Sequence, residues 1–256
     1  MLERKRLIEE AEKAISWIRE YIDKIGVNGV IIGNSGGKDS ATVIAMACKA
    51  LGKDRIITVA MPCNSISADL EDAKLVSETF SVPFLEINLS NTYQELERVI
   101  ELSDINLNSE AKINIKPRLR MTTLYAIAQS LNYLVLGTGN LCERMVGYTT
   151  KWGDSASDLN PIANFTVEEV LEIGKYLGVP EKIIKKAPSD GLGKLTDEEK
   201  MGVTYKQISE YIETGRTNES AMKIIEYKNK ISKHKREQIP IYYFKRTNFL
   251  ERNTDK

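Results

Sequence analysis

Apolar residues recur along the first half of the chain in two alternating patterns. Short runs of apolar and β-branched residues predict buried strands, and longer segments with apolar residues three or four positions apart predict amphipathic helices. The predicted strands cover residues 29–32, 55–61, 84–89 and 133–137. The predicted helices cover residues 7–25, 41–48, 69–80, 92–102 and 115–131. Pro117 would lie in the first turn of the last helix, where proline is tolerated, and the polar residues 103–109 predict a loop before it.

This alternation predicts the fold class. Strands that alternate with helices form a parallel sheet with helices on both faces, so we expect an α/β fold of Rossmann-like type. Parallel sheets bind ligands at the carboxyl ends of their strands. The turn after the first strand and the turn Gly137–Asn140 after the fourth strand should therefore lie at the same edge of the sheet.

Beyond Gly153 the pattern changes to helices and loops, which predicts a helical C-terminal part. Thr166 is a suitable cap for the first of these helices, because acidic residues follow it in the first turn. The predicted helices cover residues 166–177, 205–211 and 218–233. Residues 189–200 contain two glycines and several charges, and we expect them to form a mobile loop over a site.

Composition narrows the class of protein. With 256 residues the chain is long enough for one large α/β domain, and we expect residues 1–256 to form a single domain. Lysine plus arginine equals aspartate plus glutamate at 36 each, so no global positive field favours nucleic acid. The scattered Cys48, Cys63 and Cys142 predict neither a disulfide framework nor a zinc site. A charged N-terminus, with no apolar run near the roughly 20 residues of a membrane span, predicts a soluble cytoplasmic protein without a membrane partner.

The segment Gly33–Ser40, with the sequence GNSGGKDS, connects the first predicted strand to the following helix. Paired glycines at such a junction allow backbone N–H groups to approach a phosphate closely, and the helix N-terminus adds the positive end of its dipole. The segment is not an ordinary P-loop, because Asp39 follows Lys38 directly and Ile32 lies five residues before Gly37. We therefore expect a pyrophosphate-binding loop of another kind.

The acid in this loop changes the chemistry that the loop supports. A carboxylate at position 39 can hold a magnesium ion on the phosphates that it faces. The string Ser-Gly-Gly-x-Asp-Ser resembles the loop of the ATP pyrophosphatases, which cleave ATP between its α and β phosphates. A glycine-rich turn that binds nothing is the plain alternative.

A second polar passage follows the fourth predicted strand. It runs from Gly137 to Pro161 and is too rich in glycine, threonine, aspartate and asparagine to form core. This passage resembles the matching segment of the NAD synthetase family, whose members convert nicotinic acid adenine dinucleotide (deamido-NAD) to NAD by forming an amide. The similarity extends to residues 114–121, 186–189 and 234–236, and it covers nearly the whole chain in the family's order.

The resemblance implies roles for particular residues of this chain. The implied ATP contacts come from the loop and from two later residues: Gly33, Asn34, Ser35, Gly36, Gly37, Lys38, Asp39, Ser40, Thr138 and Ser189. Asp39 and Ser40 are the implied catalytic residues, and Asp39 and Glu143 would hold Mg²⁺ through hard oxygen ligands. The implied contacts to deamido-NAD come from Arg118, Lys151, Asp158, His234 and Lys235.

One position departs from the family's pattern. The family commonly has an ATP-binding lysine directly after the threonine that opens the helix following Asn160–Pro161, whereas this chain has Val167 after Thr166. The sequence offers several lysines that could compensate and does not decide among them: Lys38, Lys185, Lys186 and Lys194.

The implied reaction has two steps. The nicotinate carboxylate attacks the α-phosphorus of ATP to give an acyl adenylate and pyrophosphate, and ammonia then displaces AMP. The loop amides and Mg²⁺ would stabilise the departing pyrophosphate. Ammonium must lose a proton before it can attack, and Asp39 and Asp158 are candidate acceptors. Glutamine-dependent relatives carry a further amidotransferase domain, for which this chain has no room, so we expect free ammonia or a separate ammonia-supplying partner.

The resemblance also implies a homodimer. Candidate contact residues lie on the helix after residue 114 and occupy more than one of its faces: Ile115, Leu119, Leu124, Ala128 and Leu131. Two other functions remain open. A tRNA-modifying ATP pyrophosphatase shares the loop but should show a basic surface or an RNA-binding module. A nucleotide sensor without catalysis should have lost Asp39 or Glu143, and both are present.

Overall fold

The computed structural model describes residues 2–64, 67–186 and 196–244, and its centre is a parallel sheet of four strands in the order β3-β2-β1-β4. β1 (Gly29–Gly33) lies between β2 (Ile56–Ala60) and β4 (Tyr133–Leu136). The short β3 (Phe84–Glu86) forms the edge beside β2. The α/β class with a parallel, Rossmann-like sheet is therefore confirmed.

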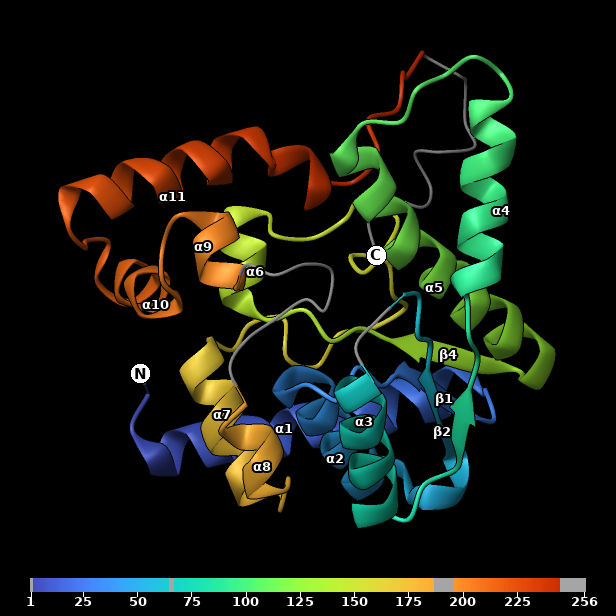
Figure 1. The fold of residues 1–256 in the computed structure, drawn as a ribbon. Helices are drawn as coiled ribbons and strands as arrows, with labels where there is room; N and C mark the ends of the chain where they lie inside the picture. The colour runs from blue at the N-terminus through green and yellow to red at the C-terminus, as the bar shows by residue number, and fades with distance from the viewer. Residues whose placement is uncertain (1, 65–66, 187–195, 245–256) are drawn as a thin grey trace.

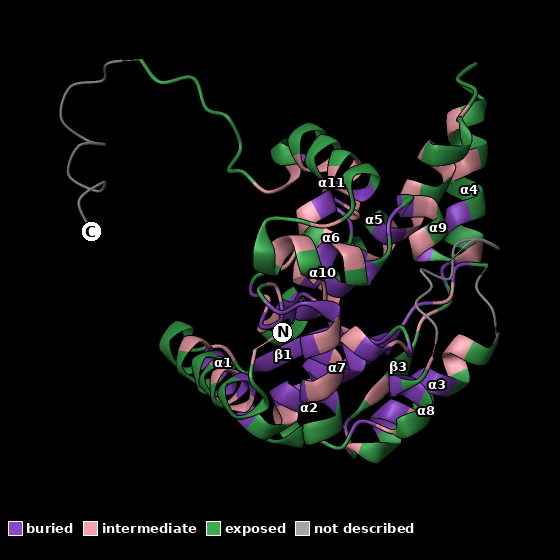
Figure 2. Cartoon of the chain, turned by 90° about the vertical axis from the view of Figure 1, so that its left-hand side faces the viewer, coloured by how far each residue is buried: buried purple, intermediate pink, exposed green. Residues whose placement is uncertain are grey.

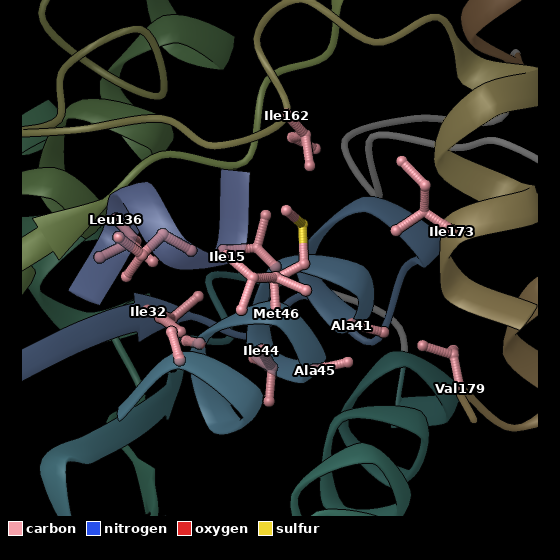
Figure 3. Close-up of a cluster of buried hydrophobic side chains, with 14 of the residues drawn as sticks. Ile15, Ile32, Ala41, Ile44, Ala45, Met46, Leu136, Ile162, Ile173 and Val179 are labelled. Carbon is pink, nitrogen blue, oxygen red and sulfur yellow. The ribbon is translucent and has the colours of Figure 1, made fainter. Parts of the chain in front are cut away.

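One face of the sheet is covered by helices from both halves of the chain (Figure 1). Its core joins Ile15, Ile32, Met46 and Ile173, which come from three helices and β1 (Figure 3). Each of these four side chains is at most 3% exposed, so the burial of apolar surface holds the layer together. The helices of this face are α1 (Arg4–Ile25), α2 (Lys38–Leu51), α3 (Ser67–Thr79), α7 (Val167–Tyr176) and α8 (Glu181–Ile184).

The opposite face is covered by α4 (Ser90–Glu101) and α5 (Ser109–Leu131). Leu124 and Ala128 of α5 belong to the cluster that packs on Ile31 of β1. Both are nearly inaccessible, at 3% and 2% exposed, so the expectation that they form a subunit contact is wrong: they are core residues of this chain.

A third group of helices lies over the carboxyl end of the sheet (Figure 1). They share an apolar cluster that includes Cys142, Met201, Tyr205 and Ile225, and this cluster also takes in Val167 from the start of α7. Figure 2 shows buried residues extending from the sheet into this group. Its members are α6 (Leu141–Val146), α9 (Asp197–Met201), α10 (Tyr205–Thr214) and α11 (Glu219–Ile231), and the chain also has short 3₁₀ turns at Lys53–Arg55 and Lys233–Lys235.

Most predicted elements are present, and the differences have local causes. α5 begins at Ser109, earlier than predicted, because the Asn108 side chain accepts a hydrogen bond from the Ala111 N–H at 2.8 Å. Pro117 therefore lies inside the helix and not in its first turn.

The predicted loop over residues 189–200 lies partly outside the described residues. Its last part is the helix α9 (Asp197–Met201), capped by Thr196, whose hydroxyl accepts from the Glu199 N–H. Within the described part of the chain, no helix has both the length and the apolarity that crossing a membrane requires.

Candidate nucleotide-binding site

The candidate site lies where the order of the strands reverses. The chain leaves β1 toward β2 on one side and later returns to place β4 on the other side of β1. The connections that follow β1 and β4 therefore lead away from each other and leave a crevice at the carboxyl ends of these strands, the position where open parallel sheets bind ligands. A pocket of about 320 Å³ lies there, and its lining includes Gly33, Asn34, Ser35, Gly37, Lys38, Asp39 and Ser40, with Gly137, Thr138, Gly139 and Glu143 from the β4 side.

Contacts with α3 determine the shape of the glycine-rich loop. Gly36 has φ +70°, and a Cβ there would lie 2.5 Å from the Asp69 carbonyl oxygen and 2.8 Å from Asp72 Cβ. Only glycine meets both conditions without strain. The buried Asn34 amide donates to the Ala73 carbonyl at 2.8 Å and accepts from the Gly36 N–H at 3.1 Å. Asn34 therefore acts on the loop's own backbone.

Hydroxyl groups hold the loop against the first turn of α2. Ser40 is 2% exposed, and its hydroxyl donates to the Gly37 carbonyl at 3.1 Å and accepts from the Ser35 N–H at 3.3 Å. Gly37 is the N-cap of α2, so the unpaired N–H groups of the first turn face the pocket. This geometry suits an anion and assigns Ser40 to the support of the loop.

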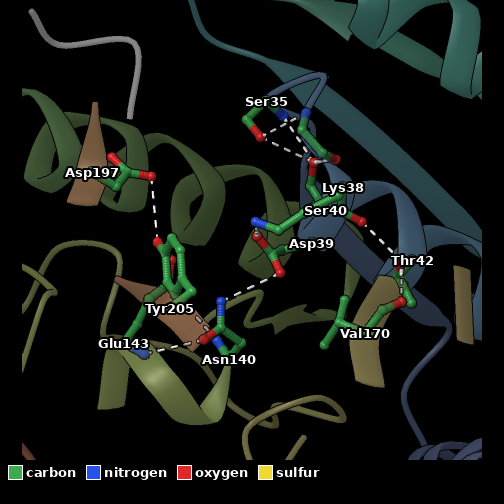
Figure 4. A network of polar contacts seen from close by, with 11 residues as sticks. Ser35, Lys38, Asp39, Ser40, Thr42, Asn140, Glu143, Val170, Asp197 and Tyr205 are labelled. Atoms are coloured by element: carbon green, nitrogen blue, oxygen red, sulfur yellow. Dashed lines mark hydrogen bonds and ion pairs between the residues drawn. The ribbon is translucent and has the colours of Figure 1, made fainter. Parts of the chain in front are cut away.

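A capping box positions Glu143 on the β4 side. Asn140, the N-cap of α6, accepts from the Glu143 N–H at 3.1 Å, and Glu143 accepts from the Asn140 N–H at 2.9 Å. The Asn140 side chain also donates to Asp39 at 3.4 Å (Figure 4). One short helix start therefore orients both carboxylates that the sequence assigns to metal binding.

The carboxylates share the pocket with a buried ammonium group. Lys38 Nζ donates to Asp39 Oδ2 at 2.8 Å and lies 5.5 Å from the centroid of the Tyr205 ring (Figure 4). Burial opposes the charge of Lys38, but Asp39 and Glu143 outweigh it and raise the lysine pKa. Burial, together with the Asp39 charge, raises the pKa of Glu143 well above its ordinary value.

The residues present fit a magnesium ion as a partner of bound phosphates. Within the described ranges, no three His, Cys, Asp or Glu side chains gather as a metal site. Asp39 and Glu143 supply two carboxylates that converge on one pocket with the α2 N-terminus. Mg²⁺ is commonly bound by one or two carboxylates plus substrate phosphates, so two protein ligands are enough.

A second cluster contains three of the residues assigned to the dinucleotide. Arg118 Nε donates to the Lys151 carbonyl at 3.3 Å, and Lys151 Nζ lies 3.4 Å from His234 Nδ1. Lys235 is next to them, but its ammonium donates to the carbonyls of Gly147 and Thr149 at 2.8 and 2.7 Å. Lys235 therefore fixes the backbone that carries Lys151.

Asp158 has other partners than the residues of this cluster. Asp158 Oδ2 accepts from the Val135 N–H at 2.7 Å, and Oδ1 accepts from the Tyr125 hydroxyl at 3.2 Å. Asp158 is not among the residues that line the pocket beside the phosphate loop. Ser189, assigned to ATP, lies outside the described residues.

Several residues of the pocket carry no assignment from the sequence. Arg120 donates to the Met61 carbonyl at 3.1 Å and belongs to the passage 114–121, where Arg118 is assigned instead. Asp197 accepts from the Tyr148 hydroxyl at 3.1 Å, and only the tertiary fold brings α9 to the pocket. The unassigned lining residues with charged or hydroxyl side chains are Asp69, Arg120, Tyr148, Asp154 and Asp197.

Lys186 connects α8 to the phosphate loop. Its ammonium lies 2.8 Å from Asp69 and 2.6 Å from Asp72, and it donates to the Gly36 carbonyl at 3.4 Å. Burial opposes ionisation of Asp72, but Lys182 and Lys186 together lower its pKa. The network fixes the start of α3 against the loop.

The structure bears on the lysines that could compensate for Val167. Val167 is 5% exposed within the apolar cluster that also contains Tyr205. Lys38 reaches the same neighbourhood, because its ammonium lies over the Tyr205 ring. Lys185 is exposed and pairs with Glu181, whereas Lys186 is held by the start of α3. Lys194 lies outside the described residues, so Lys38 is the described lysine placed at the carboxylates.

The parallel sheet, the glycine-rich loop and the facing carboxylates define a nucleotide-binding α/β protein. A family model described as NAD synthase matches residues 10–249. The chain therefore belongs to the NAD synthase family.

Individual relatives are similar over most of their length. The NH(3)-dependent NAD(+) synthetase of Carboxydothermus hydrogenoformans is 44% identical over 89% of this chain and 94% of its own. Among solved structures, an NMN synthetase from Francisella tularensis has a TM-score of 0.87 and 33% identity over 95% of this chain and 100% of its own. An NH3-dependent NAD synthetase from Campylobacter jejuni has a TM-score of 0.78 and 25% identity over 95% and 100%. These relatives do not favour the tRNA-modifying alternative.

Proposed function

We propose that this protein catalyses the ATP-dependent amidation of deamido-NAD to NAD with ammonia, releasing AMP and pyrophosphate. Membership of the NAD synthase family supports the reaction, and the curated relatives are named as NH(3)-dependent enzymes. The single observation that supports this pocket as the place of the reaction is that Asp39 and Glu143 both line it at the start of α2.

In the first step, the residues of the loop bind and orient the triphosphate. N–H groups of the first turn of α2 face the phosphates that leave as pyrophosphate, and Gly36 allows the loop to pack closely against α3. Asp39 and Glu143 would hold Mg²⁺, which supplies charge stabilisation to phosphate oxygens when bound. Fixed N–H groups need no reorganisation as charge develops on the leaving pyrophosphate.

In the second step, ammonia attacks the acyl carbon and a proton must be accepted. Asp39 lines the pocket proposed for the reacting phosphates, and Asp158 does not. This position supports Asp39 over Asp158 as the acceptor. We keep Ser40 as a member of the catalytic loop whose hydroxyl maintains the loop's shape.

We propose that Arg118, Lys151 and His234 bind deamido-NAD. Their mutual contacts support a common binding surface, and cationic groups suit the phosphates of a dinucleotide. Lys235 contributes by holding the backbone under Lys151, and we retain Thr138 and Ser189 as ATP contacts.

The test is to incubate the purified protein with ATP, Mg²⁺, ammonium and deamido-NAD and to quantify products by chromatography. The proposal requires NAD, AMP and pyrophosphate in equal amounts. Formation of ADP in place of AMP would refute cleavage between the α and β phosphates. Without ammonium, no NAD should form, and AMP should appear only slowly, through hydrolysis of the acyl adenylate.

A second candidate is synthesis of NMN from the corresponding acid mononucleotide. The observation that favours it is the likeness to an NMN synthetase, which has a higher TM-score than the NAD synthetase from Campylobacter jejuni, 0.87 against 0.78. Both reactions amidate a nicotinate carboxylate, so the loop chemistry is the same. Comparing kcat/KM for the two acids separates the candidates.

Three further properties belong to this proposal. We propose a single-domain enzyme that acts as a homodimer. An exposed apolar surface on α4, the following loop and α5 supports the dimer: Leu96, Val99, Leu102, Ile105 and Ile113. We also propose a cytoplasmic location, which the odd number and scattered positions of Cys48, Cys63 and Cys142 support, because this pattern is not that of a disulfide framework.

A further inference from the structure

The candidate site holds a buried lysine ammonium beside the two carboxylates that are proposed to bind the metal. Lys38 is only 7% exposed, although lysines are almost never fully buried unless they are paired. Its ammonium bonds to Asp39 Oδ2 at 2.8 Å, the same carboxylate that would have to bind Mg²⁺. A cation that belongs to the protein therefore already contacts one of the proposed metal ligands.

The surroundings of Lys38 hold this cation in place. Glu143 and Asp197 line the same pocket as Lys38 and Asp39. The Tyr205 ring lies 5.5 Å from Nζ, within the range of a cation–π contact. Asp197 in turn accepts from the hydroxyls of Tyr148 and Tyr205, at 3.1 and 3.4 Å. The α9–α10 region thus supplies one wall of the ammonium site (Figure 4).

We infer that the Lys38 ammonium is the resident counterion of Asp39 when no nucleotide is bound, and that it opposes binding of a divalent cation between Asp39 and Glu143. The inference rests on the proposed function only in taking Asp39 and Glu143 as the metal ligands. Two cations at one carboxylate repel each other, so the ammonium must move before a metal can bind Asp39.

The position of Lys38 in the loop provides an alternative partner for the ammonium. Lys38 is the first residue of α2, and the same first turn would face the phosphates of ATP. Bound phosphates bring negative charge close to this lysine, so they can draw the ammonium off Asp39. The metal therefore enters together with the nucleotide and not before it. Lys38 is a positioning residue in this scheme, because it controls access to the carboxylates.

The experiment measures binding of Mn²⁺ to the nucleotide-free protein by the electron paramagnetic resonance signal of free Mn²⁺. We expect weak binding by the unchanged protein and binding at least about tenfold tighter by Lys38→Met, because the competing charge is gone. The double variant Lys38→Met/Asp39→Asn should lose this gain. Lys175→Met, at an exposed lysine paired with Glu172, is the matched control and should leave Mn²⁺ affinity unchanged.

A nonhydrolysable ATP analogue completes the test. In its presence, the difference in Mn²⁺ affinity between the unchanged protein and Lys38→Met should shrink. Lys38→Gln, which keeps a polar group, replaces Lys38→Met if the latter does not fold. If a folded Lys38 variant binds Mn²⁺ no more tightly than the unchanged protein, the inference is overturned. The same conclusion holds if the substitution lowers the melting temperature and leaves Mn²⁺ affinity unchanged. A protein that passes this test but makes no NAD would refute the proposed function alone.

Discussion

At the scale of the residue, backbone geometry and long-range charge determine the site. Gly36 has a left-handed φ of +70° and packs closely against α3. Gly26 also has a left-handed φ, of +77°, but a Cβ added there would meet no atom within 4 Å. Alanine at position 26 would therefore introduce backbone strain alone, whereas alanine at position 36 would introduce both backbone strain and a steric clash.

Gly36→Ala should unfold or displace the phosphate loop. The left-handed conformation costs both alanine variants about 1–2 kcal/mol, but only Gly36→Ala must also move the start of α3. We expect Gly26→Ala to lower the melting temperature slightly and retain ATP binding. Gly36→Ala should lose ATP binding measured by calorimetry, and normal affinity would contradict the role of this contact.

Asp39→Ala should reduce turnover by at least about 100-fold, because the substitution removes a proposed metal ligand and leaves the glycines that shape the loop. The exposed Asp54 on the surface provides the control, since Asp54→Ala removes one carboxylate far from the pocket. Formation of AMP and thermal melting are measured for both. Full activity in Asp39→Ala would remove this carboxylate from the mechanism.

At the scale of the element, helix starts position the chemistry. α2 presents its N-terminus to the pocket, and α6 begins with a capping box that orients Glu143. α10 begins with an equivalent box in which Thr204 accepts from the Gln207 N–H. Thr204 does not line the pocket. A substitution at Thr204 therefore removes a helix cap only, whereas one at Asn140 removes a helix cap and also disturbs the pocket.

Asn140→Ala and Thr204→Ala should each destabilise the fold by about 1 kcal/mol through the lost cap. Only Asn140→Ala should also impair catalysis, because Asn140 orients Glu143 and contacts Asp39. Denaturant unfolding gives the stability of each variant, and steady-state kinetics gives kcat and KM. An equal loss of activity in the two variants would show that Asn140 acts through stability.

At the scale of the whole molecule, three layers place the site between the sheet and the C-terminal helices. Leu102 and Ile113, at 70% and 40% exposed, belong to the apolar surface that we assign to the homodimer. Tyr227 on α11 is similarly exposed at 64% but lies outside that surface.

Leu102→Glu/Ile113→Glu should convert the dimer to a monomer, because charged side chains resist burial in an apolar contact. Tyr227→Glu should leave the mass unchanged. Light scattering at dilute concentration measures both masses. A monomeric, fully active parent protein would refute the dimer.

The sequence predicted the features that depend on residues close together along the chain. The first strand, the helix that follows the glycine-rich turn and Thr166 as a cap are encoded within a few neighbouring residues, and these elements are confirmed. Other features depend on tertiary packing. The burial of Leu124 and the approach of Asp197 to the pocket follow from helices packing across the sheet, which one helix's periodicity does not reveal. The position of the Lys38 ammonium over the Tyr205 ring likewise follows from tertiary packing.

The strand order has a consequence for the chain while it is being synthesised. β1 pairs with β2, which follows it closely, and with β4, which the ribosome adds only about one hundred residues later. Until Leu136 has emerged, one edge of β1 exposes unpaired N–H and carbonyl groups along a strand that is buried in the finished protein. Such an edge pairs readily with other chains. We therefore expect a nascent fragment that stops before β4 to aggregate more readily than the complete chain.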